Sequence, residues 1–253
     1  MISPQIQISM ENNRSQLPHV LAIIPARGGS KGLPRKNLRL LAGEPLLVHS
    51  VRTALLSGLV TRTICSTDDP EIAEAARQCG AEVPFMRPAG LSGDTATDAD
   101  YAFHAVSWLR NEQDWLADVL VILWPTCPLR RVEDVDGAIR TLVADPTADS
   151  VVSVVRPNKS PYKMWRRTNQ GYLVPLLTSD IFEQYAGPRQ RLPEVLAPNG
   201  YVHVVRAATL LQSSSILGLK VLPFEMDSHH NFDIDTEEDF QIAEAELRTK
   251  SKL

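Results

Sequence analysis

The feature that most constrains the fold of this chain is a continuous apolar run, Val20–Pro25, that leads directly into a glycine-rich loop. A strand that is apolar at every position is typical of a parallel sheet covered on both faces, because both sides of the strand are then buried. Similar runs follow at Arg62–Ser66, Asp118–Leu123 and Ser150–Val155. Helical patterns separate these runs, at Leu46–Leu56, Pro70–Cys79, Ala99–Leu109 and Val132–Leu142. Strands that alternate with helices predict an α/β fold, a three-layer sandwich around a mostly parallel sheet.

The alternation is interrupted over about residues 156–198, a stretch with several prolines and aromatic residues. Within it, 162–167 and 171–176 are predicted to form two short strands joined by a turn. The stretch is too long for a structureless loop in a compact domain, so it predicts an inserted subdomain. The α/β pattern resumes at Tyr201–Val205 and continues to a last helix near Thr236–Leu247. Residues 1–17 are polar and aperiodic, which predicts a flexible tail before a domain covering 18–253.

The composition excludes several classes of protein. The chain has 253 residues with 43% hydrophobic and 22% charged residues, which is ordinary globular usage. A formal net charge of −4 argues against a nucleic-acid or membrane-surface binder. No apolar run approaches the length of a membrane span. The three cysteines fit neither a zinc site nor a disulfide framework, so we expect reduced thiols in a cytoplasmic protein.

The loop that follows the first strand is the first candidate site, because ligands of open α/β sheets bind at the carboxyl ends of the strands. It runs from Arg27 to Asn37 and holds three glycines and four cations. The backbone amides of Gly28, Gly29 and Ser30 can approach and cradle an anion, and the cations suit a polyphosphate. The loop matches neither the dinucleotide fingerprint nor a Walker loop. The alternative interpretation is a solvated basic turn.

A second candidate is Asp233-Ile234-Asp235-Thr236, where two carboxylates at alternate positions of an extended segment point to one side. Paired carboxylates and phosphate oxygens are the hard ligands that Mg²⁺ prefers. Asp235 or Thr236 could instead cap the last helix. A third feature, Pro125–Arg130, is predicted to form a stiff loop at a strand end.

These features together resemble the acylneuraminate cytidylyltransferases (CMP-sialic acid synthetases and their relatives), a family of Rossmann-like nucleotidyltransferases. The resemblance covers about residues 20–247, with the motifs in the family's order: Ala26–Asn37, Ser66–Asp69, Arg87-Pro88, Asp94–Thr97, Pro125–Arg130, Pro188–Gln190, Pro198–Gly200 and Asp233–Thr236. It implies transfer of CMP from CTP to a 2-keto-3-deoxy sugar acid, with release of pyrophosphate.

The resemblance also implies roles for individual residues. Arg27, Lys36 and Asn37 would contact the CTP phosphates, and Arg27 and Lys36 would be catalytic through charge stabilisation. Arg87 and the segment from Asp94 to Asp98 would border the cytidine. Asp233 and Asp235 would be catalytic through the Mg²⁺ they hold.

The inserted subdomain would contribute to the sugar site and mediate a homodimer. The residues implied on the sugar side are Trp124, Thr126, Lys163, Arg189, Asn199 and His203. Three positions there depart from the sialic-acid pattern: Trp124 replaces Gln, Ala197 replaces Arg and His203 replaces Tyr. We therefore expect an intact nucleotide half and a nonulosonate substrate other than N-acetylneuraminate.

Two alternatives stay open. Cytidylyltransferases for the eight-carbon acid Kdo typically carry Ser-Thr-Arg-Leu-Pro in the first loop and a Gln-Gly-Asp-Glu-Pro segment, whereas this chain has Ser30–Pro34 as Ser-Lys-Gly-Leu-Pro and lacks that segment. A catalytically silent nucleotide-binding protein on the same fold is the other, and the presence of Lys36, Asp233 and Asp235 argues against it.

Overall fold

A computed structural model of the chain describes residues 18–29, 32–181, 183–227 and 232–250; the predicted tail, 1–17, lies outside them. Its centre is a six-stranded sheet in the order β10-β6-β9-β5-β1-β4. The strands are β1 (Val20–Pro25), β4 (Arg62–Ser66), β5 (Val119–Ile122), β6 (Ser150–Val155), β9 (Ala197–Arg206) and β10 (Val221–Glu225). β1 pairs in parallel with β4 and β5, and β10 pairs in parallel with β6. β9 alone is antiparallel to its neighbours, so the predicted mostly parallel sheet is confirmed.

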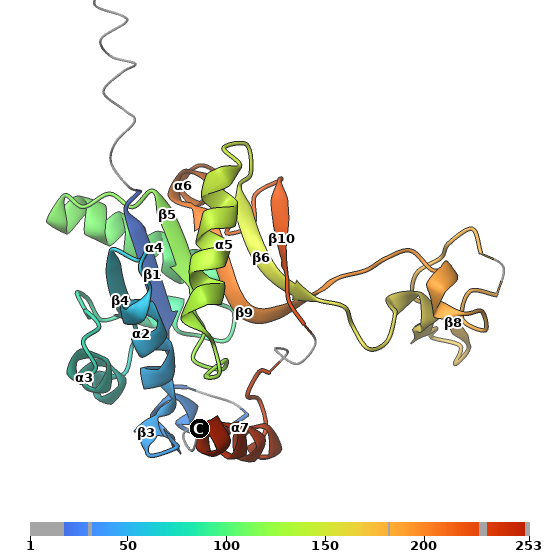
Figure 1. Cartoon of the computed structure of the whole chain (residues 1–253), viewed down its shortest axis with the longest axis horizontal. Coiled ribbons are helices and arrows are strands. Elements are labelled where there is room, and N and C mark those ends of the chain that lie inside the picture. The colour runs from blue at the N-terminus through green and yellow to red at the C-terminus, as the bar shows by residue number, and fades with distance from the viewer. Residues whose placement is uncertain (1–17, 30–31, 182, 228–231, 251–253) are drawn as a thin grey trace, which may run out of the picture.

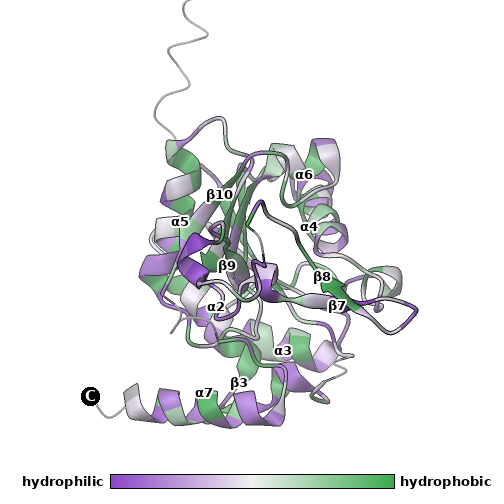
Figure 2. Cartoon of the chain, turned by 90° about the vertical axis from the view of Figure 1, so that its right-hand side faces the viewer, coloured by the Kyte–Doolittle hydropathy of each residue, from purple (hydrophilic) through white to green (hydrophobic). Residues whose placement is uncertain are grey.

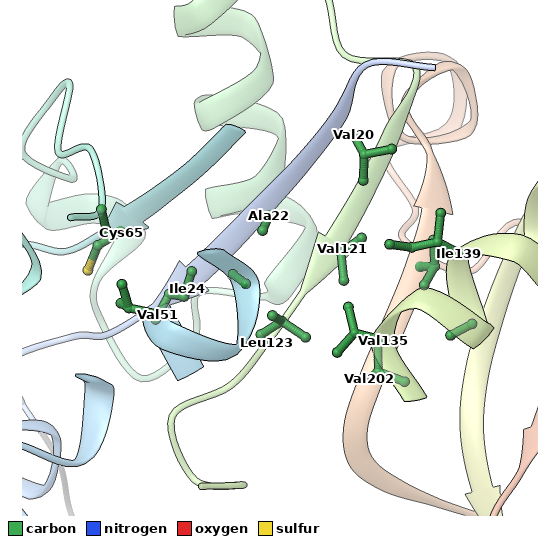
Figure 3. Close-up of a cluster of buried hydrophobic side chains, with 14 of the residues drawn as sticks. Val20, Ala22, Ile24, Val51, Cys65, Val121, Leu123, Val135, Ile139 and Val202 are labelled. Carbon is green, nitrogen blue, oxygen red and sulfur yellow. The ribbon is translucent and has the colours of Figure 1, made fainter. Parts of the chain in front are cut away.

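Helices cover both faces of this sheet (Figure 1). They are α2 (Leu46–Leu56), α3 (Pro70–Gln78), α4 (Asp98–Gln113), α5 (Val132–Ala144) and α6 (Ala207–Ser213), whereas α7 (Glu237–Lys250) lies below the sheet. Alternate residues of β1 enter two cores: Val20 and Ile24 pack with α2 and α5 (Figure 3), whereas Leu21 and Ile23 pack with α4 and α6. Both faces of β1 are therefore buried, as its uninterrupted apolar sequence predicts.

The boundaries of α3 follow from local chemistry. The carboxylate of Asp69 accepts hydrogen bonds from the backbone amides of Glu71 and Ile72, and Pro70 occupies the first helical position. Gly80 follows the helix with φ of +98°, a conformation that costs glycine little. The sequence predicts each of these features.

A third, smaller core lies beneath the sheet, where α7 packs on the hairpin of β2 (Leu40–Leu41) and β3 (Glu44–Pro45). It contains Leu33, Leu41, Leu46, Ile234, Phe240 and Ala243. Residues from the loop after β1 and from the segment before α7 therefore share one apolar cluster. This cluster holds the loop after β1 against the segment before α7.

The stretch between β6 and β9 extends away from the sheet as an arm (Figure 1). It contains an antiparallel pair, β7 (Trp165–Arg167) and β8 (Leu173–Pro175), which is the predicted hairpin. Short 3-10 turns at Pro161–Lys163 and Arg189–Arg191 flank the pair. Several apolar side chains of the arm are exposed, whereas apolar colour is concentrated in the strands of the central sheet in Figure 2. No helix in the described ranges is both long and apolar enough to cross a membrane.

Candidate active site

The loop after β1 folds against the segment before α7, although 198 residues separate them in sequence. Lys36 Nζ donates to the carbonyl of Ile234 at 2.6 Å and lies 3.3 Å from Asp235 Oδ1. A β-carbon at Gly32 would lie 2.7 Å from the carbonyl oxygen of Asp235. Glycine is thus required at position 32 for this close approach. The two motifs that the sequence analysis singled out separately form one site.

Interactions within the loop hold its backbone in place. Asn37 is buried and its amide donates to the carbonyl of Arg27 at 3.0 Å. The backbone amide of Gly28 donates to Asp68 at 3.0 Å, and a β-carbon at Gly28 would collide with Asp69. These contacts fix the ends of the loop, whereas Gly32, Pro34 and Arg35 between them are exposed. The loop contacts β4's carboxyl end from one side and the α7 segment from the other. Gly29 is exposed, and Ser30 lies outside the described residues.

Arg27 forms an ion pair with Asp94, one of the residues predicted to border the nucleotide. Its guanidinium lies 3.1 Å from Asp94 Oδ1 and donates to the carbonyl of Gly93 at 3.3 Å. Both side chains are partly exposed. An anionic ligand at this position would compete with Asp94 for Arg27, because both offer oxygens to the same donors.

Arg87 is buried beside the end of β4. It donates to the hydroxyl of Ser66 at 3.0 Å and to its carbonyl at 2.5 Å, and it lies 4.8 Å above the ring of Tyr101. Burial lowers the pKa of the Arg87 guanidinium. The hydroxyl of Tyr101 is fully buried beside the side chains of Asp98 and Trp124, and burial raises the pKa of this phenol. Tyr101 therefore packs behind Arg87.

Trp124 connects two other predicted residues. Its Nε1 donates to Asp98 Oδ1 at 3.4 Å, and its ring lies 6.3 Å from the imidazole of His203. The indole is half-buried against the α4-side core. His203 is buried with Nε2 2.9 Å from the carbonyl of Ile216, and burial lowers its pKa. The Trp124 side chain therefore lies between the start of α4 and β9.

The stiff loop after β5 contacts the acidic segment directly. The carbonyl of Thr126 accepts the backbone N–H of Ile234 at 2.9 Å. Cys127 is buried, and burial raises the pKa of its thiol to about 11, which disfavours the reactive thiolate. Arg130, also buried, donates to the carbonyl of Trp124 at 3.0 Å and fixes the loop. Asn199 is buried too, and its Oδ1 accepts from the hydroxyl of Ser153 at 2.6 Å, so it braces β9 on β6.

The acidic segment has the predicted alternation. Ile234 is fully buried, whereas Asp233 and Asp235 are exposed. Thr236 and Asp239 form reciprocal hydrogen bonds at the start of α7, so Thr236 caps the helix and Asp235 does not. The capping interpretation is thus confirmed for Thr236, and metal binding by Asp233 and Asp235 stays a prediction.

The described residues contain no group of three metal-binding side chains. Asp233 and Asp235 supply two hard carboxylate donors, which fit Mg²⁺ only where phosphate oxygens or water complete the shell. Such a metal would enter with a polyphosphate.

Lys163 and Arg189 belong to the arm and lie apart from the loop cluster (Figure 1). Lys163 Nζ donates to the carbonyl of Gly187 at 2.6 Å, and Arg189 donates to the carbonyl of Asn158 at 3.2 Å. Arg189 also lines a cavity of about 860 Å³ between the arm and the carboxyl ends of β6 and β10. Arg131 and Arg156 line the same cavity, as do acidic residues.

Sequence reasoning missed three contributors to this region. Tyr101 is one, because its apolar helical spacing indicates only a core residue. Arg39 and Glu237 are the others: they form a two-armed ion pair at 2.5 and 2.8 Å. The only signal in the sequence is that each lies within three residues of a motif residue.

The comparisons with known proteins bear on this site. A sequence model of the cytidylyltransferase family matches residues 21–166. The chain is 36% identical to a CMP-N,N'-diacetyllegionaminic acid synthase of Legionella pneumophila, over 89% of this chain and 94% of that protein. It is 31% identical to an N-acylneuraminate cytidylyltransferase of Streptococcus agalactiae over 87% of this chain, and spans about half (51%) of that longer protein.

A solved structure of a CMP:2-keto-3-deoxy-manno-octonic acid synthetase complexed with CTP has the same fold, with a TM-score of 0.68 at 18% identity over 92% of this chain and 99% of that chain. The family model covers the loop after β1, which contains Lys36. The chain therefore belongs to the cytidylyltransferase family, in the group of the acylneuraminate cytidylyltransferases, and is a nucleotidyltransferase.

Proposed function

We propose that this protein transfers CMP from CTP to the anomeric hydroxyl of a nine-carbon 2-keto-3-deoxy sugar acid and releases pyrophosphate. The observation that carries the proposal is the junction of Lys36 with Ile234 and Asp235. It sets Lys36 of the β1 loop against the acidic segment, in which Asp233 and Asp235 are exposed. That combination suits a nucleoside triphosphate and its metal.

The residues act by position and charge, because in-line displacement at phosphorus needs no covalent nucleophile. Arg27 exchanges Asp94 for a phosphate oxygen, and Lys36 turns from Asp235 toward the phosphates. The two cations then neutralise charge that builds on the leaving pyrophosphate. Asp233 and Asp235 would hold Mg²⁺, which supplies polarisation of the α-phosphate and activation of the attacking hydroxyl.

The sugar acid and the cytosine base of CTP would bind at different places. The cytidine would lie toward Arg87 and Asp98, beside the buried side chain of Tyr101. Arg189 lines a cavity on the α5 side of the sheet, apart from this chain's loop cluster, so its guanidinium could pair with a sugar carboxylate only in the site of a second subunit. Trp124 stands between α4 and β9 and would border the acceptor.

The direct test is pyrophosphate release from CTP and Mg²⁺ with a panel of acceptors. The panel contains N-acetylneuraminate, deaminated and diamino nonulosonates, and the eight-carbon acid Kdo. Release that depends on a nine-carbon acid supports the proposal. Release with Kdo alone favours the eight-carbon alternative, and no release with any acceptor contradicts the function proposed.

Substrate preference gives a sharper prediction. We expect a higher kcat/KM for a nonulosonate other than N-acetylneuraminate, as the resemblance to the legionaminic acid enzyme also suggests. Trp124→Gln should move the ratio toward N-acetylneuraminate by about tenfold, because an amide offers donors and an acceptor where the indole offers one donor. Competition between two acceptors measures the ratio.

The control for this prediction is Trp124→Phe, which retains an aromatic ring but removes the N–H that Asp98 accepts. If N-acetylneuraminate is the best acceptor of the wild type and neither substitution changes the ratio, Trp124 only packs and the assignment fails.

We also propose a two-fold homodimer formed through the arm. The exposed apolar side chains of the arm include Trp165, Leu173 and Leu177, and the arm has little surface of its own against which to bury them. Exposed apolar patches of this kind mark interfaces. We expect sedimentation equilibrium to give a dimer at micromolar concentration.

Leu173→Arg should dissociate this dimer, because it places a charge in the apolar contact. The matched control is Leu219→Arg: Leu219 is 98% exposed and lies outside the arm. A wild type that is monomeric and fully active would refute the dimer.

A further inference from the structure

Two ion pairs connect the same two segments, side by side. Lys36 pairs with Asp235 at 3.3 Å, and Arg39 pairs with Glu237 through both carboxylate oxygens at 2.5 and 2.8 Å. The partners are three residues apart on the first segment and two apart on the second. The short 3-10 turn Lys36–Leu38 and the start of α7 are therefore joined at two neighbouring points.

The two pairs face different surroundings. Lys36 and Asp235 are at the site, and Asp235 is 73% exposed on its side chain. The Arg39 guanidinium instead lies 4.3 Å over the ring of Phe240, a buried member of the α7 core. The carbonyl of Arg39 accepts the N–H of Leu46, the first residue of α2. Arg39 is thus tied to α2 and α7 rather than to the ligand side.

The proposed function requires the first pair to open. When Lys36 turns to a phosphate and Asp235 turns to a metal, the contact between them is lost, and so is one of the connections between the loop and the acidic segment. The shared apolar cluster and the Arg39–Glu237 pair then hold the segments at their spacing. Of the two ion pairs, the Arg39 pair is the one that lies outside the ligand's reach.

We infer that Arg39 and Glu237 are positioning residues that keep the cation loop and the metal-binding carboxylates in register while CTP and Mg²⁺ are bound. This inference rests on the proposed function. A preorganised spacing lets the metal and the phosphates bind together, because the segments lose no freedom on loading. Without the pair, CTP still finds its cations, but the gain in affinity that Mg²⁺ contributes becomes smaller.

The test uses Arg39→Met, which retains a stem over Phe240 but removes the two donors. Titration calorimetry measures the Kd of CTP with EDTA and with MgCl₂, so no sugar acid is needed. We expect the Mg²⁺-dependent gain in CTP affinity to fall by about tenfold, the size typical of residues that orient metal ligands. The Kd measured in EDTA should change by less than about threefold.

Three further variants complete the design. Glu237→Gln should reproduce the effect, and it is available should Arg39→Met fold poorly. The double variant should be no worse than either single one, because each residue acts through the other. Arg52→Met is the matched control: Arg52 makes the same two-armed pair with Glu44 at 2.7 and 2.6 Å, on β3 and α2, away from the acidic segment. It should leave the Mg²⁺ gain unchanged.

The outcomes separate the two proposals. If the wild type binds CTP no better with Mg²⁺ than without it, the proposed function itself fails. If the wild type shows the gain and Arg39→Met and Glu237→Gln retain it, as Arg52→Met does, the positioning role is overturned. An equal fall of melting temperature in the Arg39→Met and Arg52→Met variants, with loss of the gain in only the first, supports positioning over general stability.

Discussion

Replacing Asp235 with asparagine is expected to reduce turnover by roughly two orders of magnitude or more, at saturating CTP and Mg²⁺, without unfolding the protein. An amide oxygen cannot supply the anionic donor that a hard cation prefers. The substitution is nearly isosteric, and its Oδ1 can still accept from Lys36, which now lies 3.3 Å from the carboxylate. The loss would therefore report on charge at the metal and not on the junction between the segments.

The measurement is initial-rate pyrophosphate release together with a thermal melt. Glu238→Gln is the control, since it removes one negative charge from the same exposed surface in the first turn of α7. We expect it to stay close to wild type. Turnover of Asp235→Asn near the wild-type value, in a folded protein at high Mg²⁺, would remove Asp235 from the metal site.

Lys36→Ala is expected to lower kcat by about 10²–10³, with a much smaller rise of KM for CTP. A cation aimed at charge that develops during displacement acts mainly in the transition state. The Lys36 side chain is only 13% exposed, so its charge is screened less than that of a free surface lysine. Steady-state kinetics with CTP as the varied substrate separates the two parameters.

Lys36→Arg is the informative partner, because it restores the charge but has a planar donor group of another shape. We expect partial recovery of kcat. Should Lys36→Ala change only the KM for CTP, Lys36 is a ground-state anchor and its transition-state role is wrong.

The sheet could be predicted from the sequence because a strand that is buried on both faces is apolar at consecutive positions. Val20–Pro25 is apolar at each position and delivers alternate side chains to two cores. The bounds of α3 were equally accessible, since Asp69, Pro70 and Gly80 act on their immediate neighbours. Local chemistry of this kind needs no knowledge of the tertiary structure.

Parts of the site were not accessible in this way. The pairing of Lys36 with Asp235 depends on α7 returning beneath the sheet, where a shared apolar cluster and contacts between distant residues place it. The motifs pointed to each residue separately, without showing that they meet. The contact of Trp124 with Asp98 depends on where α4 starts relative to β5, which no local pattern records. The antiparallel direction of β9 is likewise set by the path of the arm before it.

The direction of β9 has a consequence for how such enzymes can diversify. Because β9 runs against β6, the arm leaves the sheet at Val155 and re-enters opposite it at Ala197. Its two ends are held by ladder hydrogen bonds whatever lies between them, and lengthening such a loop costs little chain entropy. The arm can therefore be replaced by one that makes other contacts to the proposed acceptor. The sheet and the residues of the nucleotide site need not change. Acceptor preference can thus evolve through substitutions in a segment that does not pack against the core.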